Sequence, residues 1–170
     1  GQRLKVVRII SDMSDMMHLR DARVLPEWVD YNGHMNDGYF AVAFSKATDL
    51  LLDEIGLDDA YRKATGFTIY TLGMQIRYLQ EVKLGEPIST FCQILEHDSK
   101  RIRVWLSTQH TEQGTELATS EQLLLCVDQS GPKAANFPSE IAARLAAIGD
   151  AHATLPIPED AGKGIRLKRV

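Results

Sequence analysis

The segment WVDYNGHMNDGYF, residues 28–40, joins a stretch expected to be extended to a stretch expected to form a long amphipathic helix. Its Asn-Gly pair at 32–33 predicts a tight turn. Asn36 or Asp37 stands where an N-cap residue belongs, with a side-chain oxygen for the free amides of the first helical turn. The segment is therefore either a capped helix entry alone, or a site where the carboxylate of Asp30 lies beside the amino end of a helix.

Downstream of this segment, residues 39–55 have the apolar spacing of a helix. Apolar side chains three and four positions apart form one face: Phe40, Ala43, Phe44, Ala47, Leu50, Leu51 and Ile55. Gly56 follows, where the left-handed backbone that ends many helices is easiest to adopt. We expect a helix that buries this face.

Beyond residue 66 the apolar spacing changes to every second residue, which predicts strands. Strands are expected over 67–79, 88–98, 101–111 and 115–128. One face of the first strand is expected to hold Tyr70, Leu72, Met74, Ile76 and Tyr78. Gly73 inside that strand predicts a bulge. The segment 138–148 has the spacing of a short amphipathic helix.

These elements predict an α+β protein, in which an antiparallel sheet of about five strands curls around one long helix, with a short C-terminal helix. Residues 18–29 supply the fifth strand, which inserts or adds at an edge. The other four strands are expected to form a meander, with neighbours in sequence paired in the sheet. Open edges in so small a sheet favour pairing with a second copy, so we expect a homodimer or a dimer of dimers.

Composition limits the remaining choices. The chain has 170 residues and a net charge of −4, which predicts one domain and argues against nucleic-acid binding. No apolar run reaches the roughly 18 residues of a membrane span. The two cysteines lie far apart and form no redox or zinc motif, so we expect reduced thiols and a cytoplasmic protein. We expect a domain over 18–150, an N-terminal extension over 1–17 and an irregular basic tail over 151–170. RLKVVRII, residues 3–10, could add an edge strand.

A carboxylate beside a helix amino end suits acyl transfer, because the free amides of the helix can hold an oxyanion. The motif DYNGHMN, residues 30–36, and the order of elements together resemble the hot-dog fold thioesterases of the 4-hydroxybenzoyl-CoA thioesterase-like branch. That branch carries the pattern Asp-x-x-x-His-x-Asn. IRYLQEVKLGEPIS (76–89) and LATSEQLLLCVDQSG (117–131) resemble its later strands and turns. The resemblance covers residues 18–148 and implies hydrolysis of an acyl-CoA thioester.

The resemblance also implies roles for the motif residues. Asp30 would be the catalytic carboxylate, which either attacks the thioester carbonyl or activates a water molecule. His34 would position Asp30 or line the thioester pocket, and Asn36 would cap the helix. The backbone of three further residues would polarise the carbonyl oxygen: Asp37, Gly38 and Tyr39. No metal is expected, because no second His or Cys lies at ligand spacing, and no cofactor beyond the CoA of the substrate.

Two alternatives stay open. A hydratase or dehydratase of the same fold would carry Asp-x-Asn-Pro-x-His, whereas here His34 follows Asp30 by four positions and the proline is missing. A non-catalytic acyl-CoA-binding protein would bind the thioester without turnover. Release of the CoA thiol would separate the thioesterase from both.

Two stretches resemble betainyl-CoA thioesterases of carnitine breakdown: LPEWVDYNGHMN (25–36) and ATSEQLLLCVD (118–128). This resemblance implies a trimethylammonium acyl group, which favours aromatic faces and a carboxylate. We expect Tyr31, Tyr70 and Glu121 to line the substrate pocket. Glu121 interrupts an apolar strand, and it is either a pocket acid or the solvent-facing residue of an alternating strand.

Overall fold

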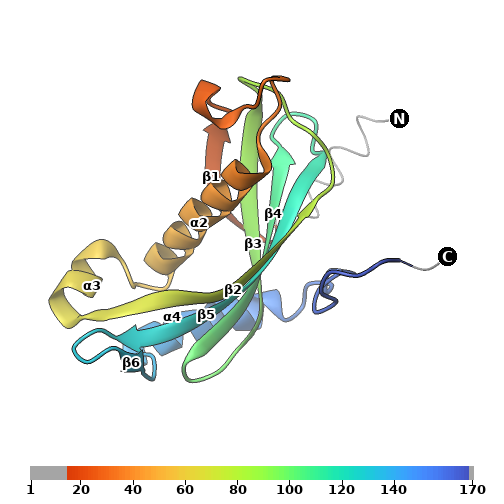
Figure 1. Cartoon of the computed structure of the whole chain (residues 1–170). Coiled ribbons are helices and arrows are strands. Elements are labelled where there is room, and N and C mark those ends of the chain that lie inside the picture. The colour runs from red at the N-terminus through yellow and green to blue at the C-terminus, as the bar shows by residue number, and fades with distance from the viewer. Residues whose placement is uncertain (1–14, 169–170) are drawn as a thin grey trace.

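The computed structural model describes residues 15–168 and shows a strongly curled sheet with α2 lying across its concave face (Figure 1). In chain order the elements are β1 (Met17–Arg23), the 3-10 helix η1 (Pro26–Trp28), α2 (Asp37–Glu54), α3 (Asp59–Thr65), β2 (Phe67–Tyr78), β3 (Pro87–His97), β4 (Arg101–His110), β5 (Glu116–Asp128), β6 (Lys133–Ala134) and α4 (Ser139–His152). The run RLKVVRII lies outside the described residues. Among the helices of 15–168, none combines the length and apolar character needed to cross a membrane.

The sheet is antiparallel in the order β1–β3–β4–β5–β2, and the short β6, which the sequence did not predict, pairs with β5. β1 lies at an edge. The predicted meander is wrong at one step, because β2 pairs with β5 instead of β3. The connector 79–86 explains this difference. The amide of Leu79 bonds to the carbonyl of Leu117, and the carbonyl of Val82 accepts from the amide of Met35, so the connector crosses the end of the sheet before β3 begins.

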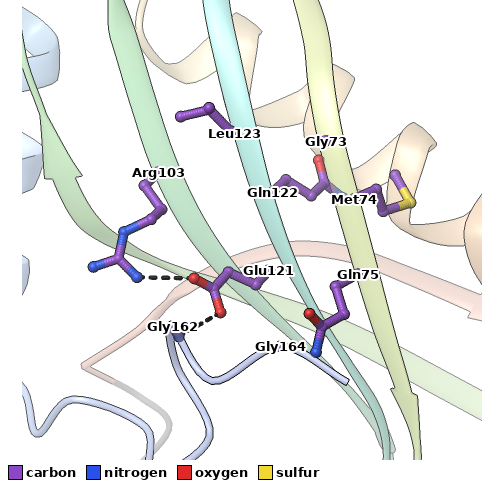
Figure 2. Close-up of a pocket in the computed structure, with 9 residues that line it drawn as sticks. All are labelled: Gly73, Met74, Gln75, Arg103, Glu121, Gln122, Leu123, Gly162 and Gly164. Atoms are coloured by element: carbon purple, nitrogen blue, oxygen red, sulfur yellow. Dashed lines mark hydrogen bonds and ion pairs between the residues drawn. The ribbon is translucent and has the colours of Figure 1, made fainter. Parts of the chain in front are cut away.

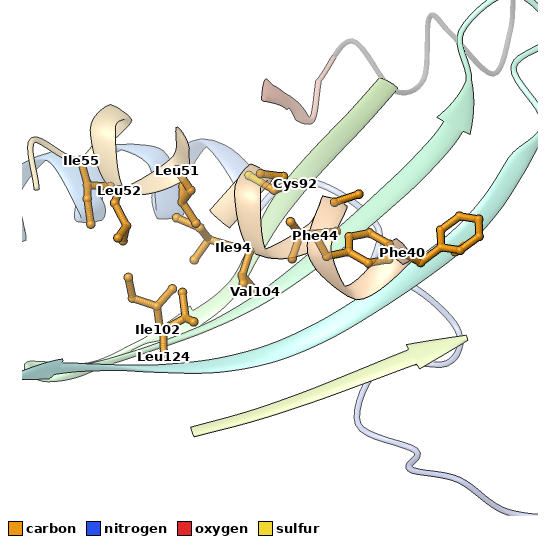
Figure 3. Close-up of a cluster of buried hydrophobic side chains, with 14 of the residues drawn as sticks. Phe40, Phe44, Leu51, Leu52, Ile55, Cys92, Ile94, Ile102, Val104 and Leu124 are labelled. Atoms are coloured by element: carbon orange, nitrogen blue, oxygen red, sulfur yellow. The ribbon is translucent and has the colours of Figure 1, made fainter. Parts of the chain in front are cut away.

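The core lies between α2 and the concave face of the sheet. The predicted helix spacing is confirmed, since the buried residues of α2 are Phe40, Ala43, Phe44, Ala47, Thr48, Leu51 and Leu52. Figure 3 shows this face of the helix against side chains of β3, β4 and β5. Thr48 Oγ1 also donates to Gln122 Oε1 at 2.9 Å, so the side chain of Gln122 points toward α2. The expected α+β class, with a sheet curled around a helix, is confirmed.

The bulge predicted at Gly73 is present, and it changes which side chains of β2 face α2. Met74 pairs with Gln122 and lies on the α2 face of the sheet. Tyr70 pairs with Leu125, three residues further along β5, and therefore lies on the opposite face. The prediction of one continuous face along β2 is wrong, because the extra residue of a bulge reverses the alternation.

The outer face of the sheet, the one turned away from α2, is crossed by the C-terminal strap, which we define as residues 153–168. One side chain from each of three strands bonds to the strap backbone: Gln93 Nε2 of β3 donates to the Pro156 carbonyl at 3.2 Å, Glu121 Oε1 of β5 accepts from the Gly162 amide at 2.8 Å, and Arg77 Nη2 of β2 donates to the Gly164 carbonyl at 2.9 Å. The strap therefore runs from β3 to the free edge of β2.

α4 ends at His152, a buried histidine that is 5% exposed and whose Nδ1 accepts from the amide of Ile94 at 2.9 Å. Burial lowers the pKa of His152 below its ordinary value of 6.5, because a charged ring would lose its hydration. Below pH 6.5 the unfolded chain therefore binds more protons at this position than the folded chain. It follows that the free energy of unfolding decreases as the pH falls through this range.

We predict that the urea midpoint of the wild type decreases between about pH 7.5 and about pH 5.5. A pKa that is one unit lower in the folded state corresponds to about 1.4 kcal/mol of unfolding free energy, lost in full only at a pH below both pKa values. In His152→Asn, Oδ1 can still accept from Ile94 but cannot be protonated in this range, so part of the decrease should disappear. His97→Asn, at an exposed histidine, is the control. Equal pH slopes for His152→Asn and the wild type would contradict the prediction.

Candidate active site

The motif forms a tight hairpin that ends where α2 begins. The amide of Asn36 bonds to the carbonyl of Trp28 at 2.8 Å, and the amide of Asp30 bonds to the carbonyl of His34 at 2.9 Å. The hairpin closes when the amide of Gly33 bonds back to the carbonyl of Asp30 at 2.9 Å. Gly33 has a φ of +76°, a conformation that glycine adopts without strain. The turn predicted at 32–33 is present, and it brings Asp30 opposite His34, close to the start of α2.

The two carboxylate oxygens of Asp30 have different surroundings. Oδ1 accepts from the amide of Asn32 at 2.9 Å and from the amide of His34 at 3.3 Å. Oδ2 makes no hydrogen bond to any residue between 15 and 168. Two backbone donors thus orient the carboxylate through one oxygen and leave the other available to a reacting group. The amides that Asp30 contacts belong to its own turn rather than to the helix.

The start of α2 is capped, as the sequence predicts. Gly38 donates its amide to Asn36 Oδ1 at 2.9 Å and to Asp37 Oδ1 at 2.8 Å, and the amide of Tyr39 bonds to the carbonyl of Asn36 at 3.0 Å. Of the three amides predicted to polarise a carbonyl oxygen, those of Gly38 and Tyr39 are therefore occupied. The Asp37 amide forms no bond within the described part of the chain. It is the donor that a ligand at the helix end could use directly.

His34 lies at the mouth of a polar cavity of about 520 Å³ between the connector 79–86 and the end of β4. Its Nε2 is 3.4 Å from Glu81 Oε2, and its backbone pairs with Lys83. The charged and titratable residues of this cavity are His34, Glu81, Lys83, Glu86 and His110. Asp30 and His34 are joined through backbone groups, and the imidazole points to the cavity.

Aromatic rings gather at the same end of α2. The rings of Trp28 and Tyr39 are stacked with centroids 6.5 Å apart, and Tyr78 donates its hydroxyl to the carbonyl of Asp37 at 3.1 Å. Burial, and then the nearby negative charge of Asp37, raises the pKa of Tyr78. The sequence placed Tyr78 on an apolar strand face but did not connect it with the motif. That connection arises because β2 ends beside the start of α2.

The three residues expected in a substrate pocket lie apart from one another. Tyr31 is 98% exposed at the tip of the hairpin, and Tyr70 lies on the outer face of the edge strand β2. Glu121 also lies on the outer face, where its Oε2 is 2.8 Å from Arg103 Nη1 and its Oε1 accepts from the Gly162 amide (Figure 2). Its charge is therefore balanced by Arg103.

Between residues 15 and 168, no group of three or more His, Cys, Asp or Glu side chains is arranged to hold a metal ion. The hairpin and the helix end offer a carboxylate oxygen and a backbone amide that no described residue bonds, on segments joined by the hydrogen bond from the Asn36 amide to the Trp28 carbonyl. This arrangement is suited to a carbonyl compound.

The comparisons with known proteins agree with this chemistry. The model of the thioesterase-like superfamily matches residues 24–145. The chain is 42% identical to a betainyl-CoA thioesterase of Pseudomonas aeruginosa, over 93% of this chain and 99% of that protein. It is 39% identical to an L-carnitine dehydrogenase/betainyl-CoA thioesterase of Rhizobium meliloti, over 93% of this chain but only 32% of that longer protein.

Two solved structures are similar over nearly the whole chain. A Staphylococcus aureus protein in complex with CoA has a TM-score of 0.84 at 25% identity, covering 90% of this chain and 97% of the other. A proposed thioesterase of Pseudomonas putida has a TM-score of 0.79 at 36% identity, covering 91% of this chain and 98% of the other.

Proposed function

Because the chain belongs to the thioesterase-like superfamily and is a thioester hydrolase acting on acyl-CoA, we propose that it hydrolyses betainyl-CoA to betaine and CoA. The resemblance to hot-dog fold thioesterases is confirmed. The observation that carries the substrate is the match to the Pseudomonas aeruginosa enzyme, which spans almost the full length of both proteins. The longer dehydrogenase fusions share only this part of their length with the chain.

In the proposed reaction, Asp30 acts on the thioester carbonyl through its unbonded oxygen Oδ2. As a nucleophile, Oδ2 would add to the carbonyl carbon, the C–S bond would break, and water would then hydrolyse the resulting anhydride. As a base, it would take a proton from the water that adds to the carbon, after which the C–S bond would break and the leaving CoA thiolate would take up a proton. In both routes the carbonyl oxygen becomes negative, and the amide of Asp37 is the donor proposed to stabilise it. His34 is proposed to line the path to the thioester, and the proposal assigns no role to a metal.

The proposed assembly is a homodimer that pairs the free edges of β2. Within the described residues, β2 has a strand partner on one side only. Four large side chains are exposed along it: Tyr70 (43%), Leu72 (54%), Met74 (38%) and Tyr78 (53%). Apolar side chains beside an unpaired edge favour association with another strand. The expected location is the cytoplasm, in keeping with two buried free thiols, Cys92 and Cys126.

The substrate can be tested with a matched pair of thioesters. Betainyl-CoA and 3,3-dimethylbutyryl-CoA have the same shape, but only the first carries a positive charge. After correction for uncatalysed hydrolysis, we expect kcat/KM for thiol release to favour betainyl-CoA by about tenfold or more, the effect of one desolvated cation contact. Equal values would contradict the betainyl assignment. Absence of thiol release from every acyl-CoA, with hydration of an enoyl-CoA, would instead support the hydratase alternative.

A further inference from the structure

A cavity of about 420 Å³ lies between the strap and the outer face of the sheet. From the sheet, Trp105, Glu116 and Thr119 line it, and from the strap, Leu155, Glu159 and Asp160. The strap forms one wall of the cavity and is held against the sheet where Gln93 Nε2 donates to the carbonyl of Pro156, which also lines the cavity. None of the hairpin residues 30–36 lines this cavity, and it shares only Leu79 with the cavity at His34.

The charge of this lining is one-sided. Glu116, Glu159 and Asp160 contribute three carboxylates, and among residues 15–168 no Lys or Arg lines the cavity. None of the three forms an ion pair within residues 15–168. Glu116 is instead oriented by a hydrogen bond from Ser107 Oγ. The neighbouring Glu121, by contrast, has Arg103 as its partner. Carboxylates without a cationic partner around one cavity favour a positively charged occupant.

Two largely buried side chains that line the cavity carry polar atoms that no described residue bonds, which is an observation independent of these charges. Trp105 is 6% exposed and Thr119 is 4% exposed. Neither the indole N–H of Trp105 nor the hydroxyl of Thr119 makes a hydrogen bond to another residue of the described chain. Both atoms lie on the wall of the cavity and stay accessible to solvent, so an occupant of the cavity could bond to them in place of water.

We propose that this cavity binds a small quaternary ammonium compound, with the carboxylates of Glu159 and Asp160 around the cation and the indole of Trp105 beneath it. An aromatic ring and carboxylates together recognise a cation that cannot donate hydrogen bonds. The indole N–H and the Thr119 hydroxyl can serve a carboxylate on the same compound. The preference for a cation stands on the cavity alone, whereas the choice of a quaternary ammonium rests on the proposed function.

The same chemistry has two sources, the acyl end of betainyl-CoA and a free compound such as the betaine product. Calorimetric titration with choline chloride, and with 3,3-dimethylbutan-1-ol as its uncharged analogue, tests the cavity directly. Choline should bind the wild type saturably and about tenfold or more tightly than the alcohol, as a desolvated cation–π contact predicts. Equal binding of the two compounds, or no saturable binding of choline, would overturn the proposal.

The double variant Glu159→Gln/Asp160→Asn removes two charges from the strap without removing a hydrogen bond that either side chain makes in the described structure. Choline binding should weaken about tenfold in this variant and also in Trp105→Leu, if that variant folds. Asp150→Asn, at an exposed acid of α4 outside the cavity, should bind as the wild type does. Unchanged choline binding in the double variant would overturn the proposal.

Steady-state kinetics of the double variant distinguish the two sources of the cation, the acyl end of betainyl-CoA and a free compound. A KM that rises for betainyl-CoA but not for 3,3-dimethylbutyryl-CoA would place the acyl end in the cavity and would contradict the proposed role of Asp30, because only one methylene separates the ammonium from the thioester carbonyl. Unchanged KM values together with lost choline binding would support a separate site for a free compound. If the wild type binds choline but does not hydrolyse betainyl-CoA, the proposed substrate fails and the cation site stands. The opposite result overturns only the cation site.

Discussion

Replacement of Asp30 by asparagine should lower kcat for thioester hydrolysis by about 10²–10⁴-fold and leave the fold intact, the usual loss when an acid–base group is removed. Asparagine keeps an oxygen at the position of Oδ1, so the hydrogen bonds from the amides of Asn32 and His34 can remain. What disappears is the charge and nucleophilicity of the second oxygen. Both proposed roles of Asp30 need that oxygen as an anion, and both predict this loss.

The matched control is Asp58→Asn. Asp58 also accepts a backbone hydrogen bond, from Tyr61 at the start of α3, but it lies outside the motif. This variant should keep wild-type kcat, and both variants should keep the wild-type circular dichroism spectrum and urea midpoint. An Asp30→Asn enzyme with normal kcat would remove the carboxylate from the mechanism, and the helix end and the polar cavity would have to supply the catalysis.

Introduction of a carboxylate at the free edge of β2 should convert the proposed dimer to a monomer. Leu72 is 54% exposed on β2, and pairing of two β2 edges would bury an added aspartate on each subunit without a partner. An unpaired charge buried at an interface costs several kcal/mol, which corresponds to a rise in the dissociation constant of about 100-fold or more. Light scattering should give twice 19.0 kDa for the wild type and 19.0 kDa for Leu72→Asp.

Ile157→Asp is the control for this variant, since Ile157 is 72% exposed on the strap and its substitution also adds one charge. It should remain dimeric. If the thioester site is completed across the β2 edges, kcat of Leu72→Asp should fall with the dimer fraction and recover at high protein concentration. A wild-type chain that is monomeric at all concentrations would contradict the proposed assembly.

The local features of this fold could be predicted from the sequence, because they depend on residues near one another in the chain. The spacing of Phe40, Phe44 and Leu51 gave the buried face of α2, and the Asn-Gly pair gave the hairpin turn. The position of β2 could not be predicted in this way. It depends on the contact between the connector 79–86 and the hairpin, which joins segments about fifty residues apart, as the bond between Met35 and Val82 shows.

The candidate site also has a part that the sequence predicts and a part that only the folded structure shows. Asp30, His34 and Asn36 are close in sequence, and the hairpin brings them together at the start of α2. Tyr70 was expected beside the substrate, but the bulge at Gly73 turns it to the outer face, and no spacing rule predicts the pairing that fixes that bulge. Glu159 and Asp160 lie in a segment that looks like an irregular tail, so only the folded strap shows them beside Trp105.

The strap has a consequence for the order in which the chain can fold during synthesis. Every strand it crosses is made before it, yet Glu121 and Arg77 receive their backbone partners only from Gly162 and Gly164. On a ribosome, where chains emerge amino end first, α2 can cover the concave face of the sheet early. The outer face of the sheet stays exposed to solvent until these glycines emerge. A nascent chain stalled before residue 162 should therefore retain the helical core and expose Trp105 to a soluble quencher.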